Sequence, residues 1–166
     1  MRPADVETER ARLGLHAADD LNELRGGVGV RGARGEQSPL EDVVPYAGRI
    51  TRRGLTVMDT PGLDVESVTG MVGGGAQVVV FTTGLGTPTG NPIAPVIKIT
   101  GNARTARQMA DNIDLDVSGI MAETETLDAS ADRLFDEVLA VASGRETAAE
   151  RLGHREFAIH RRNPTI

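Results

Sequence analysis

The chain has 166 residues, enough for one domain with a hydrophobic core, and its hydrophobic fraction of 39% suits a globular protein. Its formal net charge of −6 argues against a basic nucleic-acid-binding face, and the absence of cysteine excludes disulfides, thiolate nucleophiles and cysteine-bound zinc. No apolar run approaches the ~20 residues of a membrane helix, and the charged start does not resemble a signal peptide. We therefore expect a cytoplasmic protein that binds neither nucleic acid nor membranes.

The first 52 residues are expected to form an N-terminal helical segment, residues 1–25, and then a glycine-rich loop and lead-in, residues 26–52. Apolar residues stand at helical spacing in the first segment: Leu13, Ala17, Leu21 and Leu24. The loop contains a GxGxxG pattern, but it follows a helix and runs into Ser38–Pro39. A dinucleotide-binding loop follows a strand and opens a helix, so we interpret this one as a connection.

Residues 53–166 are expected to form an α/β domain around three apolar runs. These are "GLTVMD" (54–59), "AQVVVFTT" (76–83) and "APVIKIT" (94–100). Continuous β-branched runs are typical of strands that are covered on both faces, so we interpret the three as neighbouring strands of a buried sheet.

Helices are expected over residues 65–72, 103–111 and 126–143, with a last short helix opening at 147–150. Asp64 is expected to cap the first of them, and glycines 73–75 to end it, which gives a βαβ unit. Gly144 ends the third helix, whose apolar face is Leu127, Ala131, Leu134, Val138 and Val141. The predicted fold class is α/β, with an open, mostly parallel sheet and helices on both faces in a Rossmann-like, three-layer arrangement.

Polar residues follow each of the three apolar runs, where ligands bind in open α/β sheets. They are Asp59, Thr82, Thr83, Thr100 and Asn102. Gly84 and Gly86 let the backbone approach a ligand and offer it N–H groups. We predict a site where hydroxyl and amide groups hold an oxyanion, although the stretch that begins at Asp59 is also compatible with a plain turn.

Lys98 interrupts the third apolar run and points to the opposite face from Ile97 and Ile99. In a half-exposed strand its side chain would be solvated. In a buried strand its ammonium group would need a carboxylate or a ligand, because an unpaired buried charge is costly. Both interpretations stay open from the sequence.

Three aspartates, at positions 111, 114 and 116, form an acidic cluster after the predicted third strand. Carboxylate oxygens are ligands of hard divalent cations, which makes Asp114 and Asp116 candidate metal ligands. The spacing matches no EF-hand loop. A helix cap and a surface loop account for the cluster nearly as well.

The stretch from Gly54 to Asn102, "GLTVMDTPGLDVESVTGMVGGGAQVVVFTTGLGTPTGNPIAPVIKITGN", is more specific than any of its parts. Together with "MADNIDLDVSG" and "ERLGHREF" it resembles the carboxyl-terminal region of the altronate dehydratase and galactarate dehydratase family of sugar-acid hydro-lyases. The resemblance covers roughly residues 30–160.

The resemblance implies elimination of water from an aldonic or aldaric acid to give a 2-keto-3-deoxy acid, with a divalent metal, iron or manganese, as cofactor. With such a substrate, we expect Thr82, Thr83, Thr100 and the amides of Gly84 and Gly86 to hold carboxylate or hydroxyl groups of a small sugar acid. Lys98 would neutralise developing negative charge, and Asp59 or Asn102 would position hydroxyls or metal-bound water.

Two departures from the family affect the functional hypothesis. Leu85 stands where the family usually has an arginine, which removes a bidentate carboxylate donor. Family enzymes are also much longer, so we expect a module that needs further domains or a partner chain, and we also expect a homo-oligomer. The alternative is a non-catalytic remnant of the family that binds a small carboxylic acid or serves a structural role.

Overall fold

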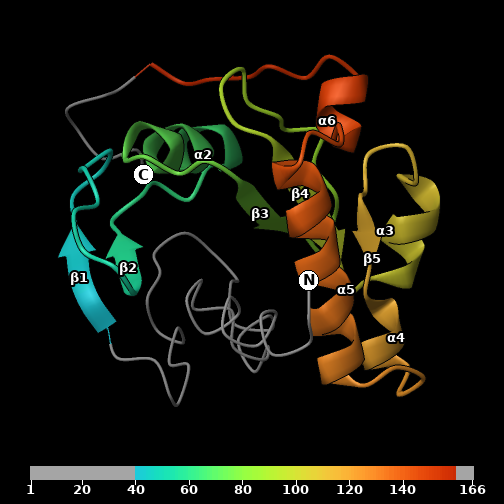
Figure 1. The fold of residues 1–166 in the computed structure, drawn as a ribbon. Coiled ribbons are helices and arrows are strands. Elements are labelled where there is room, and N and C mark those ends of the chain that lie inside the picture. Colours follow the sequence, from blue (N-terminus) through green and yellow to red (C-terminus); the bar gives the residue numbers. More distant parts are fainter. Residues whose placement is uncertain (1–39, 160–166) are drawn as a thin grey trace.

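The computed structural model describes residues 40–159, so the predictions for residues 1–39 lie outside the described residues (Figure 1). The elements follow one another as β1 (Leu40–Val44), β2 (Leu55–Met58), α2 (Asp64–Gly73), β3 (Val79–Thr82), β4 (Val96–Thr100), α3 (Ala103–Gln108), β5 (Leu115–Asp116), α4 (Ser118–Met121), α5 (Leu127–Ala142) and α6 (Ala148–Arg151). Within this range no helix has the length and apolar character that crossing a membrane demands.

The strands form two parallel sheets, one of β1 and β2 and one in the order β3-β4-β5. Parallel strands that alternate with helices confirm the predicted α/β fold class. One expectation was wrong: β2 and β3 are not ladder neighbours, because they belong to different sheets (Figure 1). The helix between them therefore connects two sheets.

Strand β1 was not predicted, because it lies in the segment interpreted as a lead-in. Its sequence, "LEDVV", carries Glu41 and Asp42 between apolar residues and shows no continuous apolar run. Val43 in this strand is 60% exposed. Such a composition is typical of an edge strand, which needs only one covered face and one ladder partner.

Helix α2 packs against both sheets. Gly70 of the helix lies against the ring of Tyr46, which follows β1, and Gly74, the residue after the helix, lies against the side chain of Met58 in β2. Toward the three-stranded sheet α2 presents Val68, which is buried with Val79 of β3. The absence of side chains on one stripe of α2 is what lets it approach the smaller sheet closely.

The ends of α2 correct one prediction and confirm another. The residue before the helix is Leu63, which makes no side-chain cap, and Asp64 lies inside the first turn. There its carboxylate interacts favourably with the helix dipole instead of capping. The helix ends at Gly73 as predicted, and Gly75 follows with a φ of +114° that favours glycine.

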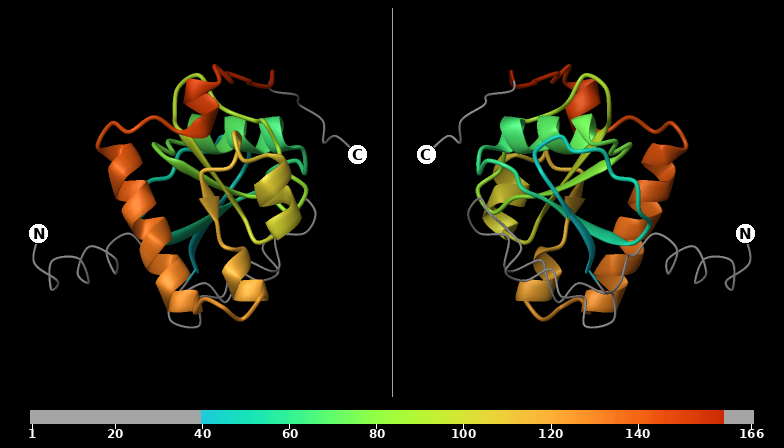
Figure 2. Two further views of the ribbon diagram at one scale, coloured as in Figure 1. Left: turned by 90° about the vertical axis from the view of Figure 1, so that its right-hand side faces the viewer. Right: turned by 90° about the vertical axis from the view of Figure 1, so that its left-hand side faces the viewer.

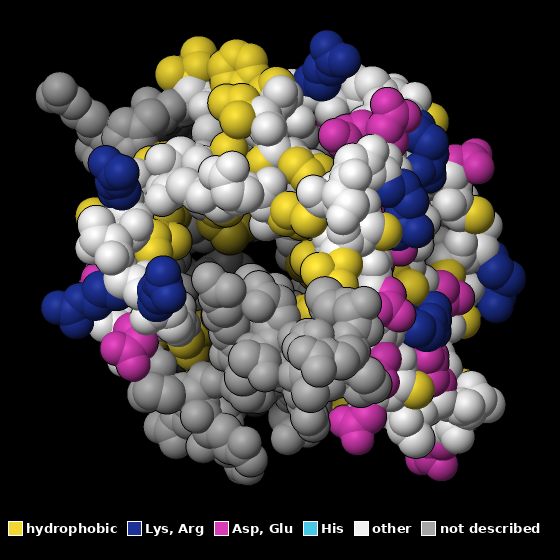
Figure 3. All heavy atoms as spheres, in the orientation of Figure 1, with side chains coloured by type: hydrophobic (Ala, Val, Ile, Leu, Met, Phe, Trp, Pro, Cys, Tyr) yellow, Lys and Arg dark blue, Asp and Glu magenta, His cyan; other side chains and the backbone are white. Residues whose placement is uncertain are grey.

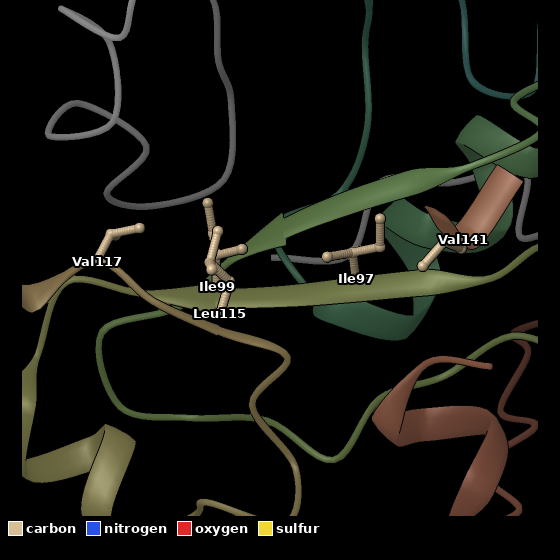
Figure 4. Close-up of a cluster of buried hydrophobic side chains, with 5 residues drawn as sticks. All are labelled: Ile97, Ile99, Leu115, Val117 and Val141. Carbon is tan, nitrogen blue, oxygen red and sulfur yellow. The ribbon is translucent and has the colours of Figure 1, made fainter. Parts of the chain in front are cut away.

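Helices α2 and α5 cover opposite faces of the three-stranded sheet (Figure 2). Ile97 and Ile99 of β4 pack with Val141 of α5, whereas Val96 packs with α2. Alternate residues of a strand point to opposite faces, so this division follows from the strand period. Figure 4 shows the cluster on the α5 side: Ile97, Ile99, Leu115, Val117 and Val141.

The apolar face predicted for α5 is confirmed in its carboxyl-terminal half, where Leu134, Val138 and Val141 pack in this cluster. The helix begins after Thr126, whose hydroxyl accepts a hydrogen bond from the Ala129 amide. The capping box predicted between Thr147 and Glu150 is present at the start of α6. Phe135, which is 2% exposed, is a core residue that the predicted face omitted.

Replacing Gly70 with alanine tests the close approach of α2 to the smaller sheet. A β-carbon at this position would overlap the Tyr46 ring, so we expect Gly70→Ala to lower the free energy of unfolding by about 1–3 kcal/mol in urea denaturation. The Tyr46→Ala background is the control. There the same change should stabilise by up to ~1 kcal/mol, because alanine favours a helix more than glycine does. Equal effects in both backgrounds would contradict the contact.

Candidate functional site

The carboxyl ends of β3, β4 and β5 open on one edge of the three-stranded sheet, because the three strands are parallel. Thr83 follows β3, and its amide donates to the Ile99 carbonyl at 3.0 Å, which extends the ladder by one residue. Asn102 follows β4 after Gly101 and begins helix α3. The structure therefore brings the predicted residues of these two strand ends to the same place.

A turn after β3 and the cap of α3 are joined through one carbonyl group. The Gly84 carbonyl accepts hydrogen bonds from Asn102 Nδ2 at 3.0 Å and from Thr105 Oγ1 at 2.7 Å. Asn102 Oδ1 accepts from the Arg104 amide at 3.0 Å and caps the helix. We call Thr83, Gly84, Gly86, Asn102 and Thr105 the strand-end unit.

Within the strand-end unit, the Gly86 amide donates to Thr83 Oγ1 at 2.9 Å. Gly86 has a φ of +89°, and a β-carbon there would overlap the Met109 side chain, so only glycine fits both the turn and the packing. Thr100 is buried, and its hydroxyl accepts from the Asn102 amide at 3.2 Å. Several groups that were predicted to bind substrate thus have internal partners that order the turn.

The exposed part of this edge includes Gly84, Leu85 and the segment from Gly101 to Arg104. Leu85 is 91% exposed and occupies the position where an arginine was expected from the family resemblance. Thr82 and Thr83 are half-buried behind it. A ligand that approaches this edge would meet backbone groups together with the exposed side chains of Leu85 and Asn102.

Lys98 is fully buried, and within residues 40–159 no hydrogen bond joins its ammonium group to the strand-end unit. Its Nζ donates to the Pro88 carbonyl at 3.3 Å, beneath the loop of residues 83–95. Burial lowers the pKa of this ammonium group, while the nearby carboxylates of Asp114 and Glu156 raise it. Of the two interpretations of Lys98, the structure therefore shows the buried one, with the carboxylates of Asp114 and Glu156 nearby.

Asp114 binds two backbone amides, one through each carboxylate oxygen. Oδ2 accepts from the Lys98 amide at 2.7 Å, and Oδ1 accepts from the Ala148 amide at the start of α6 at 2.6 Å. Asp116 Oδ1 accepts from the Ser118 amide at 2.8 Å. Both aspartates thus fix backbone, and Asp114 does so between two distant segments.

The described residues do not fit a divalent metal centre. No group of three His, Cys, Asp or Glu side chains within residues 40–159 is close enough to hold an ion. Both oxygens of Asp114 already accept amide hydrogen bonds. Metal ligation by Asp114 and Asp116 stays a prediction to which this geometry adds no support.

Asp59 is exposed at the carboxyl end of β2, and its amide donates to the Val44 carbonyl at 3.0 Å. It therefore belongs to the smaller sheet. Among the described residues, no hydrogen bond or ion pair joins its side chain to the strand-end unit. Its proposed role is untested by this arrangement.

Sequence reasoning missed a set of polar contacts that holds the loop of residues 83–95 over Lys98. The Gly90 amide donates to Glu156 Oε2 at 2.9 Å, and His154 Nδ1 lies 3.1 Å from Glu156 Oε1. Thr87 and Thr89 are buried, with their hydroxyls 2.8 Å apart. The sequence offered one signal, a lysine within an apolar run. A buried lysine needs polar partners, but the sequence does not show which residues they are.

The comparisons with known proteins agree with the resemblance found in the sequence. The family profile described as D-galactarate/Altronate dehydratase, C-terminal, matches residues 28–165. The chain is 41% identical over 127 residues to the (2R)-sulfolactate sulfo-lyase subunit beta of Chromohalobacter salexigens, covering 76% of this chain and 33% of that protein.

Two further relatives are from Escherichia coli. The chain is 31% identical to altronate dehydratase over 129 residues, which is 78% of this chain and 26% of that protein. It is 35% identical to galactarate dehydratase (L-threo-forming) over 129 residues, which is 76% of this chain and 25% of that protein. The chain thus spans a quarter to a third of the length of these relatives.

Replacing Asp114 with alanine tests whether this carboxylate is a structural clamp. The change leaves two backbone amides without their acceptor and removes a carboxylate near Lys98, so we expect a loss of about 3–5 kcal/mol in the free energy of unfolding. Asp116→Ala is the matched control and should cost no more than ~1 kcal/mol, because it removes one exposed hydrogen bond. Similar losses in both variants would contradict the clamp.

Glu156 generates a pH dependence in the acid range. Burial alone would raise its pKa, but the Gly90 amide and the His154 ring hold it below its ordinary value of 4.5. A depressed folded-state pKa contributes stability that is present above pH 4.5 and is lost as the pH falls through the folded value.

In Glu156→Gln this acid-dependent part of the stability should be absent. The measurement is urea denaturation between about pH 3 and 6, the range in which carboxylates titrate. Glu146→Gln, at an exposed position, is the matched control and should keep the wild-type pH profile. An unchanged profile in Glu156→Gln would show that the contact with Gly90 does not contribute.

Proposed function

The chain belongs to the D-galactarate/altronate dehydratase carboxyl-terminal family, and we propose that it forms the part of a family lyase that binds the substrate carboxylate at the strand-end unit. The observation that supports this best is positional. The exposed backbone of Gly84 and Leu85 and the Asn102 side chain lie together where open α/β sheets bind ligands.

The named substrates of the relatives suggest the substrate class. Altronate, galactarate and sulfolactate each carry a hydroxyl group on the carbon next to a carboxylate. We therefore assign to this chain a 2-hydroxy carboxylate with a leaving group on the following carbon. In the relatives' names that group is either water or a sulfo group, so the sequence family does not fix it.

The proposed reaction is a β-elimination. A base takes the proton from the hydroxyl-bearing carbon, and the electron pair of that C–H bond forms the carbon–carbon double bond. The C–O or C–S bond at the next carbon breaks, and its electron pair leaves with the departing hydroxide or sulfite. The resulting enol takes up a proton on the carbon that lost the leaving group, its hydroxyl group loses its proton, and the product is a 2-keto acid.

In this proposal the strand-end unit stabilises negative charge on the carboxylate. Charge accumulates there as the proton leaves, and fixed amide and hydroxyl groups act most strongly when they need no reorganisation. The bonds to the Gly84 carbonyl supply that order by fixing the turn after β3 to the start of α3. Lys98 is assigned a positioning role, because its ammonium group holds Pro88 of the same loop and is buried beneath it.

The rest of the site is proposed to come from a partner polypeptide or from further domains. The chain matches only a quarter to a third of its relatives, and one relative is named as a subunit. The general base, any ligands of a divalent iron or manganese ion and a partner for Asp59 would come from there. Homo-oligomer formation stays a prediction.

A non-catalytic carboxylate-binding role is the second candidate. It is favoured by Leu85, which is 91% exposed at the position where the family resemblance implies an arginine. Loss of that bidentate donor would weaken carboxylate binding. A leucine at this position would also fit a family member that acts on a different substrate.

The test combines this chain with the part of the Chromohalobacter salexigens subunit beta that lies outside the matched segment. Formation of a 2-keto acid is followed with altronate, galactarate and (2R)-sulfolactate as substrates. Thr83→Val should lower kcat/KM by ~10-fold or more, because it removes the acceptor that orders the Gly86 amide.

Thr51→Val is the matched control, because Thr51 is exposed between β1 and β2, outside the three-stranded sheet. It should leave kcat/KM within ~2-fold of the wild type. A mixture that binds these acids without forming keto acid would favour the second candidate. Full activity in Thr83→Val would contradict the proposed site.

A further inference from the structure

The two sheets stand side by side beneath α2, with no ladder between β2 and β3 (Figure 1). Each of the facing strands has only one neighbour in the described part of the chain, β1 for β2 and β4 for β3. Parallel strands of α/β proteins normally lie inside a continuous sheet. The edges that face each other here are therefore unusual.

The hydrogen bonds show which backbone groups face the space between the sheets. On β3, the Val79 and Thr83 amides donate toward β4, so the N–H and C=O groups of Val80 and Thr82 point away from it. On β2, the Asp59 amide donates toward β1, so the groups of Thr56 and Met58 point away from β1. Four N–H and four C=O groups thus lie on the two outer edges.

The side chains at these edges are incompletely covered. All four residues of β2 are only half-buried, and Val80, in the interior of β3, is 37% exposed. Thr56 Oγ1 is inaccessible to solvent and has no hydrogen-bond partner among the described residues. Figure 3 shows a hollow in this face, between the elements of the two sheets, with hydrophobic side chains at its rim.

We propose that a β-strand from the part of a family lyase outside this chain inserts between β2 and β3 and joins the two sheets into one. The identity of this partner rests on the proposed function. A strand in this place would hydrogen-bond on both of its edges, as in β-strand addition, and would cover Val80. The inserted strand must contain no proline, because both of its edges would form ladder hydrogen bonds and proline has no N–H group to donate.

A second copy of this domain does not meet the requirement. Each strand within residues 40–159 already has at least one ladder neighbour, so it has at most one free edge. The inserted strand needs two free edges. The relatives extend well beyond the matched segment, which is 33% of the sulfo-lyase subunit, and supply the chain length for it.

Amide hydrogen exchange tests the proposal on the full chain alone and mixed with the unmatched part of the Chromohalobacter salexigens subunit beta. We expect a complex in which exchange at the Thr56, Met58, Val80 and Thr82 amides slows by ~100-fold or more. No complex, or a complex in which these amides exchange as in the free chain, would overturn the proposal. So would amides that are already protected in the free chain, because the space would then have another occupant.

Val80→Pro removes one outward N–H group and keeps the β3–β4 ladder, since proline fits an edge strand whose N–H faces outward. It should weaken the complex by ~10-fold or more by titration calorimetry. Val43→Pro is the matched control on the far edge of β1, and it should bind within ~2-fold of the wild type. Equal binding by Val80→Pro and the wild type would also overturn the proposal.

The outcomes separate this inference from the proposed function. Turnover of a hydroxy acid by a complex with unprotected edge amides would keep the proposed function and reject the inserted strand. Protected amides in a complex that neither binds nor converts any of the three acids would keep the inserted strand and reject the proposed function.

Discussion

The clamp made by Asp114 is the constraint on which the described domain depends. One carboxylate joins the backbone of β4, at Lys98, to the start of α6, at Ala148. The same carboxylate raises the pKa of the Lys98 ammonium group, which burial lowers. A lysine can therefore stand fully buried in the central strand, where an isolated charge would be costly.

Lys98 in turn holds the loop of residues 83–95, which begins at the predicted site. This loop is tied at three points: the Gly84 carbonyl to α3, the Pro88 carbonyl to Lys98, and the Gly90 amide to Glu156. A loop fixed in this way presents its exposed residues in one arrangement, which is what a preorganised anion site requires. In the proposed function the buried lysine has a positioning role, through its hydrogen bond to the loop backbone.

The sequence predicted what depends on local pattern. Continuous β-branched runs identified β2, β3 and β4, and the capping box and Gly144 located helix ends, because these signals act within a few residues. Strand β1 was missed because its charged residues break the apolar run. The separation of β2 from β3 could not be predicted, since ladder pairing is decided by tertiary contacts with distant segments. For the same reason the sequence could not name the partners of Lys98, whose ammonium group donates to the Pro88 carbonyl and lies near the carboxylates of Asp114 and Glu156.

The most direct test of the central claim, that the strand-end unit receives a substrate carboxylate, is an amide nitrogen–proton NMR titration of the chain in complex with the proposed partner polypeptide. Addition of (2R)-sulfolactate, altronate or galactarate should shift the Thr83, Gly84 and Leu85 amide signals and the Asn102 side-chain signals. The Gly90 amide, held by Glu156, should not shift. Saturable binding that leaves the signals of residues 83–85 and 102 unchanged would contradict the account.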